Sequence, residues 1–178
     1  MLMLGAAGAL CCLTAGTALG GWMRERRLCR LRMLRAEIEA LGGMRLLLEQ
    51  ERPAMPDLLL SCAGYAPGGP GGDVVASRFT RAAQELLREP LSGLDAAYAR
   101  ACVQTPAPWE RLEERAAMEM LFRQLGSGSA AMREQAAAAC VRRLKPLEEA
   151  ARDEAETGGK LCVQLGMLLG LMVGILLW

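Results

Sequence analysis

The chain has long apolar stretches at both ends and a mixed pattern of apolar and polar positions in its middle. No charged side chain occurs in residues 1–23 or in residues 161–178. A helix rises about 1.5 Å per residue, so even the shorter stretch reaches about 27 Å, close to the roughly 30 Å hydrocarbon thickness of a bilayer. The pattern predicts a transmembrane helix at 1–23, a domain at 24–160 and a second transmembrane helix at 161–178.

In the middle part, apolar residues recur at three- and four-residue steps, which is typical of helices with one buried face. Proline and glycine interrupt this pattern, because proline cannot continue a helix. The predicted helices cover residues 24–51, 57–63, 74–89, 94–103, 109–125 and about 130–156. The sequence GYAPGGPGGD at 64–73 is predicted to form a flexible loop that ends at Asp73, the expected N-cap of the next helix.

The spacing also assigns inward-facing residues to two of these helices. In the helix at 74–89 they are Phe79, Ala83, Leu86 and Leu87. In the helix at 109–125 they are Leu112, Ala116, Met120 and Leu121. Aromatic residues make up only 4% of the chain, and its abundant alanine, leucine, arginine and glutamate favour helices over sheets. The predicted fold class is all-α, an antiparallel helical bundle flanked by two transmembrane helices.

Charge predicts the orientation of the chain in the membrane. Residues 24–35 carry six arginines and one glutamate, a local charge of +5, which leaves −4 for residues 36–160 because the total is +1. Basic residues next to a span stay on the cytoplasmic side, so we expect the domain in the cytoplasm and both termini outside. This balance is not typical of a nucleic-acid-binding protein, whereas the basic segment suits anionic lipid headgroups.

The residue content offers little catalytic chemistry. The chain has no histidine, which removes the commonest general base near neutral pH and the commonest zinc ligand. Its seven cysteines form no C-x-x-C motif, and an odd number argues against a disulfide framework. The cysteines are interpreted as reduced, structural thiols. We predict no catalytic, cofactor-binding or metal-binding residue and no enzyme activity.

Glycine recurs at every fourth position in parts of both apolar ends. Gly16 and Gly20 form one G-x-x-x-G pair, and Gly166, Gly170 and Gly174 form two overlapping pairs. A glycine face lets another helix approach closely, and close packing drives helix association in lipid. These five residues are predicted to pack against another helix, which belongs to the other end of this chain, to a second copy or to another protein.

Several short motifs together resemble the stage III sporulation protein AB family. Segment 121–178 resembles the end of that family, in which a leucine–glycine turn leads to a helix with an early glutamine, and a lysine precedes a glycine-containing span. The matching residues are Leu125-Gly126, Gln135, Lys160, Leu165-Gly166 and Gly170-Leu171. Segment 46–63 resembles a family stretch with a glutamate before a proline-bounded turn, matched here by Glu49, Pro53 and Pro56.

The resemblance implies a function. The family belongs to an assembly that joins the mother cell to the forespore and resembles secretion machines, and its helical domain is similar to those of type II secretion and type IV pilus platform proteins. This implies a non-enzymatic platform subunit of the inner membrane, with its domain in the mother-cell cytoplasm. The implied partners are a companion cytoplasmic ATPase and other membrane subunits of the channel, and a second copy of the chain is a further candidate.

Partner-binding residues are expected at both ends of the bundle. Glu49 and Arg52 lie at the proline-bounded turn, and Ser127, Ser129 and Gln135 are placed at the other end; their alternative role is to cap and turn helices. The alternative function is a membrane-anchored helical receptor or signalling scaffold. Such a protein usually has its domain outside the cell, whereas the basic segment at 24–35 predicts a cytoplasmic domain. A membrane-anchored enzyme that uses carboxylates alone ranks last.

Overall fold

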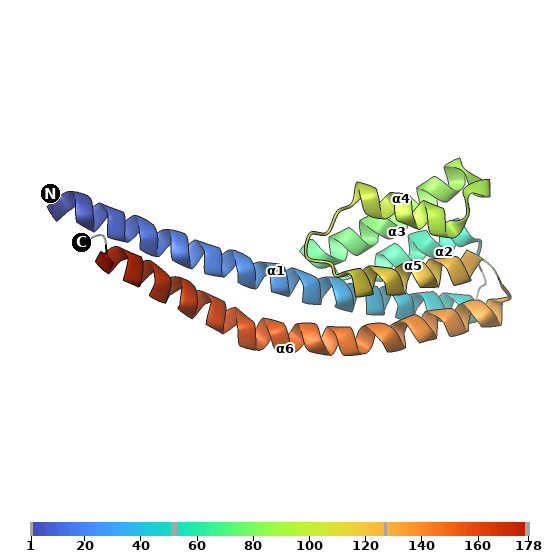
Figure 1. Ribbon diagram of the computed structural model, residues 1–178. Helices are drawn as coiled ribbons and strands as arrows, with labels where there is room; N and C mark the ends of the chain where they lie inside the picture. Colours follow the sequence, from blue (N-terminus) through green and yellow to red (C-terminus); the bar gives the residue numbers. More distant parts are fainter. Residues whose placement is uncertain (1, 51–52, 127, 177–178) are drawn as a thin grey trace. The chain divides into compact units, whose positions relative to one another are not determined.

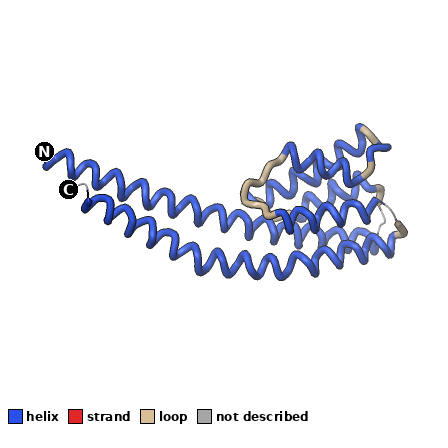
Figure 2. Tube along the Cα trace, in the orientation of Figure 1, coloured by secondary structure: helices blue, strands red, loops and turns tan. Residues whose placement is uncertain are grey.

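The computed structural model describes residues 2–50, 53–126 and 128–176, with side chains except at 2–13, 159–163, 165–167, 169–171 and 173–176. Every element in this part of the chain is a helix (Figure 2), which confirms the predicted all-α fold. The chain divides into two compact units. Described residues of 30–149 form the bundle, and those of 1–29 and 150–178 form the terminal unit.

Two long helices contribute to both units, and shorter helices complete the bundle (Figure 1). The long ones are α1 (Leu2–Gln50) and α6 (Ala130–Leu176). The shorter ones are α2 (Met55–Tyr65), α3 (Pro70–Arg88), the 3-10 helix η1 (Pro90–Ser92), α4 (Leu94–Gln104) and α5 (Leu112–Gly126). In the bundle α2 packs on α3, α3 on α4 and α4 on α5, because the connections between them are short.

Helices α1 and α6 lie side by side in the bundle and run in opposite directions (Figure 1). Two contacts fix this alignment: Arg45 lies 3.8 Å from Glu134, and Arg35 lies 2.9 Å from Glu148. The end of α1 and the start of α6 therefore lie at one end of the bundle, which we call the far end. Helix α1 enters and α6 leaves the bundle at the opposite end, which we call the entry end.

Three aromatic rings form the centre of the core. Tyr98 of α4 stacks on Phe122 of α5 with ring centroids 3.9 Å apart, and Phe79 of α3 lies 5.8 Å from Phe122. All three side chains are at most 1% exposed. The chain has two phenylalanines and two tyrosines. Three of these four rings lie in the core, where large side chains bury the most surface.

The connection between α2 and α3 is shorter than predicted. Helix α2 extends to Tyr65 and α3 begins at Pro70, so the prediction of a flexible loop over 64–73 is wrong at both ends. Gly71 packs so closely on the α1 backbone that a β-carbon would overlap it, and only glycine fits there. Asp73 is not the N-cap: from inside the first turn its carboxylate accepts the Gly69 N–H at 3.1 Å.

Helix α5 turns a different face to the core than its spacing predicted. Leu112, Ala116 and Met120 are exposed, and Leu121 is the one predicted residue that is buried. The buried residues are Glu114, Ala117, Met118, Leu121, Phe122 and Leu125. The prediction is wrong because a buried charge, Glu114, sets the rotation of the helix, as the contacts described below show. 

The predicted inner face of α3 is confirmed in part. Phe79 and Ala83 are buried and Leu86 is half-buried. Leu87 is 62% exposed, against the prediction. It lies in the last turn of α3, where the chain passes into η1 and leaves the core.

In the terminal unit, α1 and α6 contact each other through Arg27. Its Nη1 donates a hydrogen bond to the Glu154 carbonyl oxygen at 3.2 Å, and a β-carbon at Gly158 would overlap the same guanidinium. Gly20 is buried and Gly16 is half-buried. The packing predicted for these two glycines remains a prediction.

Parts of both predicted transmembrane helices lie outside the described residues. Side chains are not described at 1–13 or at most positions of 161–178, including the predicted packing residues Gly166, Gly170 and Gly174. Among the residues that the structure describes, no helical stretch combines the length and the apolar character that a membrane crossing needs.

Replacing the central ring provides a test of this core. We expect Phe122→Ala to lower the free energy of unfolding by about 3–5 kcal/mol, because it removes a fully buried ring and leaves a cavity. Leu112→Ala, at a side chain that is 86% exposed, should change it by no more than about 0.5 kcal/mol. Urea denaturation of the purified chain followed by circular dichroism measures both, and equal losses would contradict the observed orientation of α5.

Candidate functional site

A deeply buried ion pair connects α1 with α5. Arg30 Nε donates to Glu114 Oε1 at 2.6 Å, and the two side chains are 6% and 0% exposed. The other oxygen, Oε2, accepts the backbone N–H of Arg111 at 3.0 Å. One carboxylate therefore satisfies a free N–H at the start of α5 and also pairs with α1. Because an uncompensated buried charge is costly, this pair fixes which face of α5 turns inward.

A second buried pair joins α3 to the connection between α4 and α5. Arg78 Nη1 and Nη2 donate to the two carboxylate oxygens of Glu110, both at 2.7 Å. Nη2 also donates to the Thr105 carbonyl oxygen at 3.3 Å. Two parallel hydrogen bonds give such a pair a defined orientation as well as strength. The connection at residues 105–111 is therefore held against α3 at both of its ends.

Glu37 of α1 lies in the interior close to these pairs. It is 1% exposed, and neither of its carboxylate oxygens has a hydrogen-bond partner among the described residues. Burial raises its pKa well above the usual range, the charges of Glu110 and Glu114 raise it further, and Arg78 lowers it. A buried ionised carboxylate without a partner is costly, so the surroundings of Glu37 favour its protonated form. The core thus contains an acid with a raised pKa close to elements that are joined by ion pairs.

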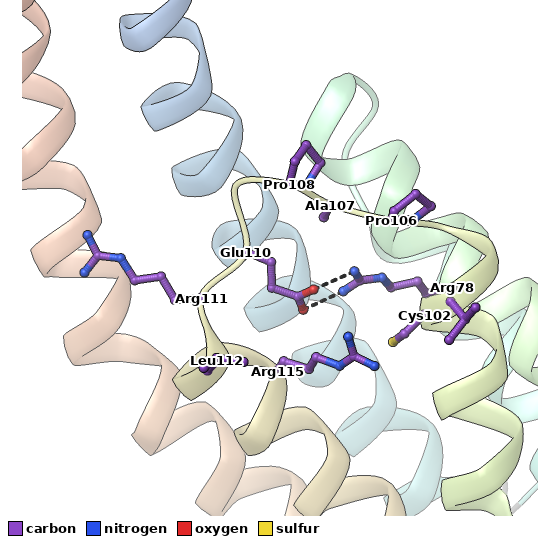
Figure 3. A pocket seen from close by; sticks show the side chains of 10 residues that line it. Arg78, Cys102, Pro106, Ala107, Pro108, Glu110, Arg111, Leu112 and Arg115 are labelled. Carbon is purple, nitrogen blue, oxygen red and sulfur yellow. Dashed lines mark hydrogen bonds and ion pairs between the residues drawn. The ribbon is translucent and has the colours of Figure 1, made fainter.

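Figure 3 shows a pocket of about 300 Å³ where the α4–α5 connection passes over the Arg78–Glu110 pair. It is lined by Arg78, Cys102, Val103, Pro106, Ala107, Pro108, Glu110, Arg111, Leu112 and Arg115. The Arg115 side chain reaches toward the ion pair, whereas Arg111 points away from it. Arg78 and Glu110 neutralise each other, and Arg115 pairs with Glu119 at 2.9 Å, so the rim of the pocket is partly apolar and its charges are largely compensated.

The cysteines in the described part of the chain show little nucleophilic character. Those with described side chains are Cys29, Cys62, Cys102 and Cys140, all of them buried and none in a disulfide with another described cysteine. Burial raises the pKa of Cys62 and of Cys140 to about 12, and it also raises the pKa of Cys102. Because the thiolate is the reactive form, these groups are inert at neutral pH. The prediction of reduced structural thiols is confirmed for these four; Cys11, Cys12 and Cys162 lie outside the described side chains.

Two of the predicted partner-binding residues that the structure describes, Glu49 and Ser129, do not lie at opposite ends of the bundle. The contact between Arg45 and Glu134 aligns the last turns of α1 with the first turns of α6. Glu49 and Ser129 therefore both lie at the far end, and both are exposed. The expected separation is wrong because α1 and α6 run antiparallel, which brings residues distant in sequence to the same end.

The remaining predicted residues have different surroundings. Ser129 Oγ accepts the Met132 backbone N–H at 3.4 Å and so acts as the N-cap of α6, the alternative role considered above. Gln135, one turn further along, lines a hollow between α5 and α6. Arg52 and Ser127 lie outside the described residues.

Sequence reasoning missed the buried charges, although their spacing carried a signal. Arg78 lies three residues after Val75 and four residues before Ala82, and both neighbours are buried. A helix brings residues three and four apart to the same face, so a charged residue in that position must be buried with them. Glu37 occupies the same kind of position in the apolar stripe of α1. Such a residue predicts an interior ion pair or a neutral acid.

In the part of the chain that the structure describes, antiparallel segments of two long helices pack with shorter helices in a bundle that buried charges join. The chain belongs to the stage III sporulation protein AB family, whose family model matches residues 5–178. This confirms the resemblance and gives the protein a role in sporulation. No curated protein and no solved structure matches the chain.

The buried pair at the pocket can be tested against a matched exposed pair. We expect Glu110→Gln to reduce the free energy of unfolding by about 3–5 kcal/mol, because it leaves the Arg78 charge buried without compensation. Glu119→Gln removes the partner of Arg115, a pair of similar length at 2.9 Å whose side chains are 38% and 43% exposed. Its loss should cost less than about 1 kcal/mol. Chemical denaturation of both variants is the measurement, and similar small losses would show that the Arg78–Glu110 pair has no special role.

Glu37 makes stability depend on pH in a predictable direction. Its pKa is raised by folding, so the folded state binds more protons than the unfolded state above the ordinary carboxyl range of about 4.3, and stability falls as pH rises from there toward the folded-state pKa. Glu37→Gln removes this dependence, and its stabilising effect should reach about 1–3 kcal/mol at pH 8 and be smaller at pH 5. Urea titrations at both pH values measure it, with the exposed Glu39→Gln as control. An effect independent of pH would mean that Glu37 is ionised in the fold.

Proposed function

We propose that the protein is a platform subunit of a sporulation channel complex, held at the inner membrane by its two apolar ends and docking a cytoplasmic ATPase through its bundle. The sporulation role follows from family membership; the membrane attachment, the ATPase and the channel are the content of the proposal. Such a subunit connects the ATPase to the membrane complex and transmits its movement, so the proposed function requires no catalytic centre.

The antiparallel arrangement of α1 and α6 is the observation that carries this proposal. The Arg35–Glu148 contact at 2.9 Å aligns the two helices near the entry end of the bundle. Inside the terminal unit, the Arg27 guanidinium still contacts the Glu154 carbonyl. The segments that lead to residues 1–23 and 161–178 therefore leave the bundle at the same end. A chain whose two ends enter one membrane from the same side requires this arrangement.

The basic segment at 24–35 has a structural role as well as the proposed electrostatic one. Arg30 is buried against Glu114, and Arg35 pairs with Glu148. The side chains of these two arginines therefore form ion pairs within the bundle. Orientation by positive charge rests on the other arginines of the segment, among which Arg24 and Arg32 are exposed.

The buried pairs provide a route for mechanical coupling. A force applied to α5 reaches α1 through the Arg30–Glu114 contact, and a force on the α4–α5 connection reaches α3 through the Arg78–Glu110 contact. Helices that are packed and paired in this way move as rigid elements rather than deforming continuously. In the proposed function, movement of the ATPase passes from the bundle to α1 and α6.

Copurification of the full-length chain with its companion ATPase tests the proposal. We expect the detergent-solubilised chain to retain the ATPase, while an unrelated cytoplasmic ATPase of similar net charge is not retained. The other membrane subunits of the complex are included, so that correct assembly is checked in the same sample. If the complex assembles and the ATPase is absent from it, the docking function is wrong.

A topology measurement distinguishes the platform from the receptor or signalling scaffold. Gly68 lies exposed in the short connection between α2 and α3, so a reporter inserted there should leave the bundle intact. The platform function requires this reporter in the cytoplasm and a second reporter at the C-terminus outside. A reporter at Gly68 that is found outside the cell would favour the receptor.

A further inference from the structure

A groove lies between α5 and α6 on the surface of the bundle. Its larger hollow, of about 470 Å³, is lined by Gln124, Met132, Gln135, Ala136, Ala139 and Arg142. A smaller hollow of about 40 Å³ continues it, shares Gln124, Ala136 and Ala139, and adds Met120 and Arg143 to the lining. We call the two together the α5–α6 groove. It lies between the neighbouring helices α5 and α6.

The floor and the walls of the groove differ in character. Small side chains form the floor, where α5 and α6 approach so closely that Cys140 Sγ lies 3.6 Å from the Ala117 carbonyl oxygen. Methionines form the walls: Met120 is 42% exposed and Met132 is 58% exposed. Small residues let another helix come close, and methionine adapts to varied apolar partners.

The charges at the groove have one sign. Arg142 and Arg143 are exposed, and no carboxylate lines either hollow. Arg143 donates to Met120 Sδ at 2.9 Å, and neither arginine forms an ion pair with any described carboxylate. Elsewhere in the bundle, arginines such as Arg35 and Arg100 pair with glutamates. The groove therefore combines accessible apolar side chains with positive charge that no described carboxylate compensates.

We infer that the α5–α6 groove is the docking site for an amphipathic helix of a partner protein, with an apolar face flanked by aspartate or glutamate. In helix-in-groove recognition, an amphipathic helix lays its apolar face into a groove of this kind, and apolar side chains at helical spacing act as its anchors. The flanking carboxylates pair with Arg142 and Arg143, which favours the correct partner and speeds its association. The inference deepens the proposed function and rests on it for the identity of the partner, the companion ATPase.

Two kinds of variant block the groove without entering the core. Arg142→Glu with Arg143→Glu reverses its charge, and Ala139→Trp fills it at a half-buried position. The matched controls lie outside the groove and are exposed: Arg88→Glu with Lys145→Glu for charge, and Gln84→Trp for bulk. Circular dichroism and urea denaturation of each full-length variant confirm that it is folded before binding is measured.

Synthetic helical peptides test the groove without the ATPase. One peptide carries a leucine face flanked by glutamates, and the other has lysines in place of the glutamates. We expect fluorescence anisotropy to show that the glutamate peptide binds the full-length chain at least about tenfold more tightly than the lysine peptide. The Arg142→Glu/Arg143→Glu variant should reverse this preference, and the charge control should retain it. Binding that is the same for the groove variant and the control overturns the inference.

The purified ATPase then tests the identity of the partner. We expect Ala139→Trp to weaken its binding at least about tenfold and Gln84→Trp to leave it unchanged. If the ATPase binds wild type and Ala139→Trp equally, the groove inference is wrong and the platform function stands. If the ATPase binds no form of the chain while the peptide preference reverses as expected, the docking site stands and the platform function fails.

Two other occupants are also tested. If Ala139→Trp abolishes self-association of the full-length chain in sedimentation and the peptides do not bind, the occupant is a second copy. If the charge-reversed variant loses binding to vesicles of anionic phospholipid and the peptides do not bind, the groove contacts lipid. Either result overturns the inference.

Discussion

The assembly of the bundle depends on two arginine–glutamate pairs that are buried in its interior. Removing two charges from water costs about as much as their attraction returns, so such pairs add little net stability over apolar side chains. Breaking one is expensive, however, because a charge then stays buried alone. Arg30–Glu114 and Arg78–Glu110 therefore act mainly by selecting one arrangement of the helices. They decide which face of α5 turns inward and where the α4–α5 connection lies.

The same pairs relate the interior to the surface. With Glu114 held inside by Arg30, Leu112 and Met120 turn outward. Leu112 then borders the pocket of Figure 3, and Met120 borders the α5–α6 groove. The burial of Glu114 on one side of α5 therefore determines which side chains α5 presents to the pocket and to the groove. Because α5 is fixed to α1, a partner bound at the groove acts on an element that is coupled to the long helices.

Much of the fold followed from local pattern. The period of the apolar residues and the breaks at proline and glycine predicted every α-helix of the bundle, and Ala130 was placed correctly at the start of α6. The candidate site was predicted less well. Gln135 does line a surface hollow and Glu49 and Ser129 are exposed, but Arg78, Glu110 and Glu37 were missed. Spacing places a charged side chain on a face, whereas its partner comes from a helix far away in the sequence.

The sequence by itself determined the helical class, the approximate extent of the helices and the family, because helix formation depends on residues three and four positions apart. Only the tertiary structure decided the rotation of α5, the early start of α3 at Pro70 and the location of both Glu49 and Ser129 at one end of the bundle. Each of these is set by a contact between distant segments: Glu114 with Arg30, Gly71 with the α1 backbone, and Arg45 with Glu134. A buried charge requires a counter-charge, and a close approach of two backbones requires glycine. These requirements, rather than the local apolar pattern, set the positions of the elements.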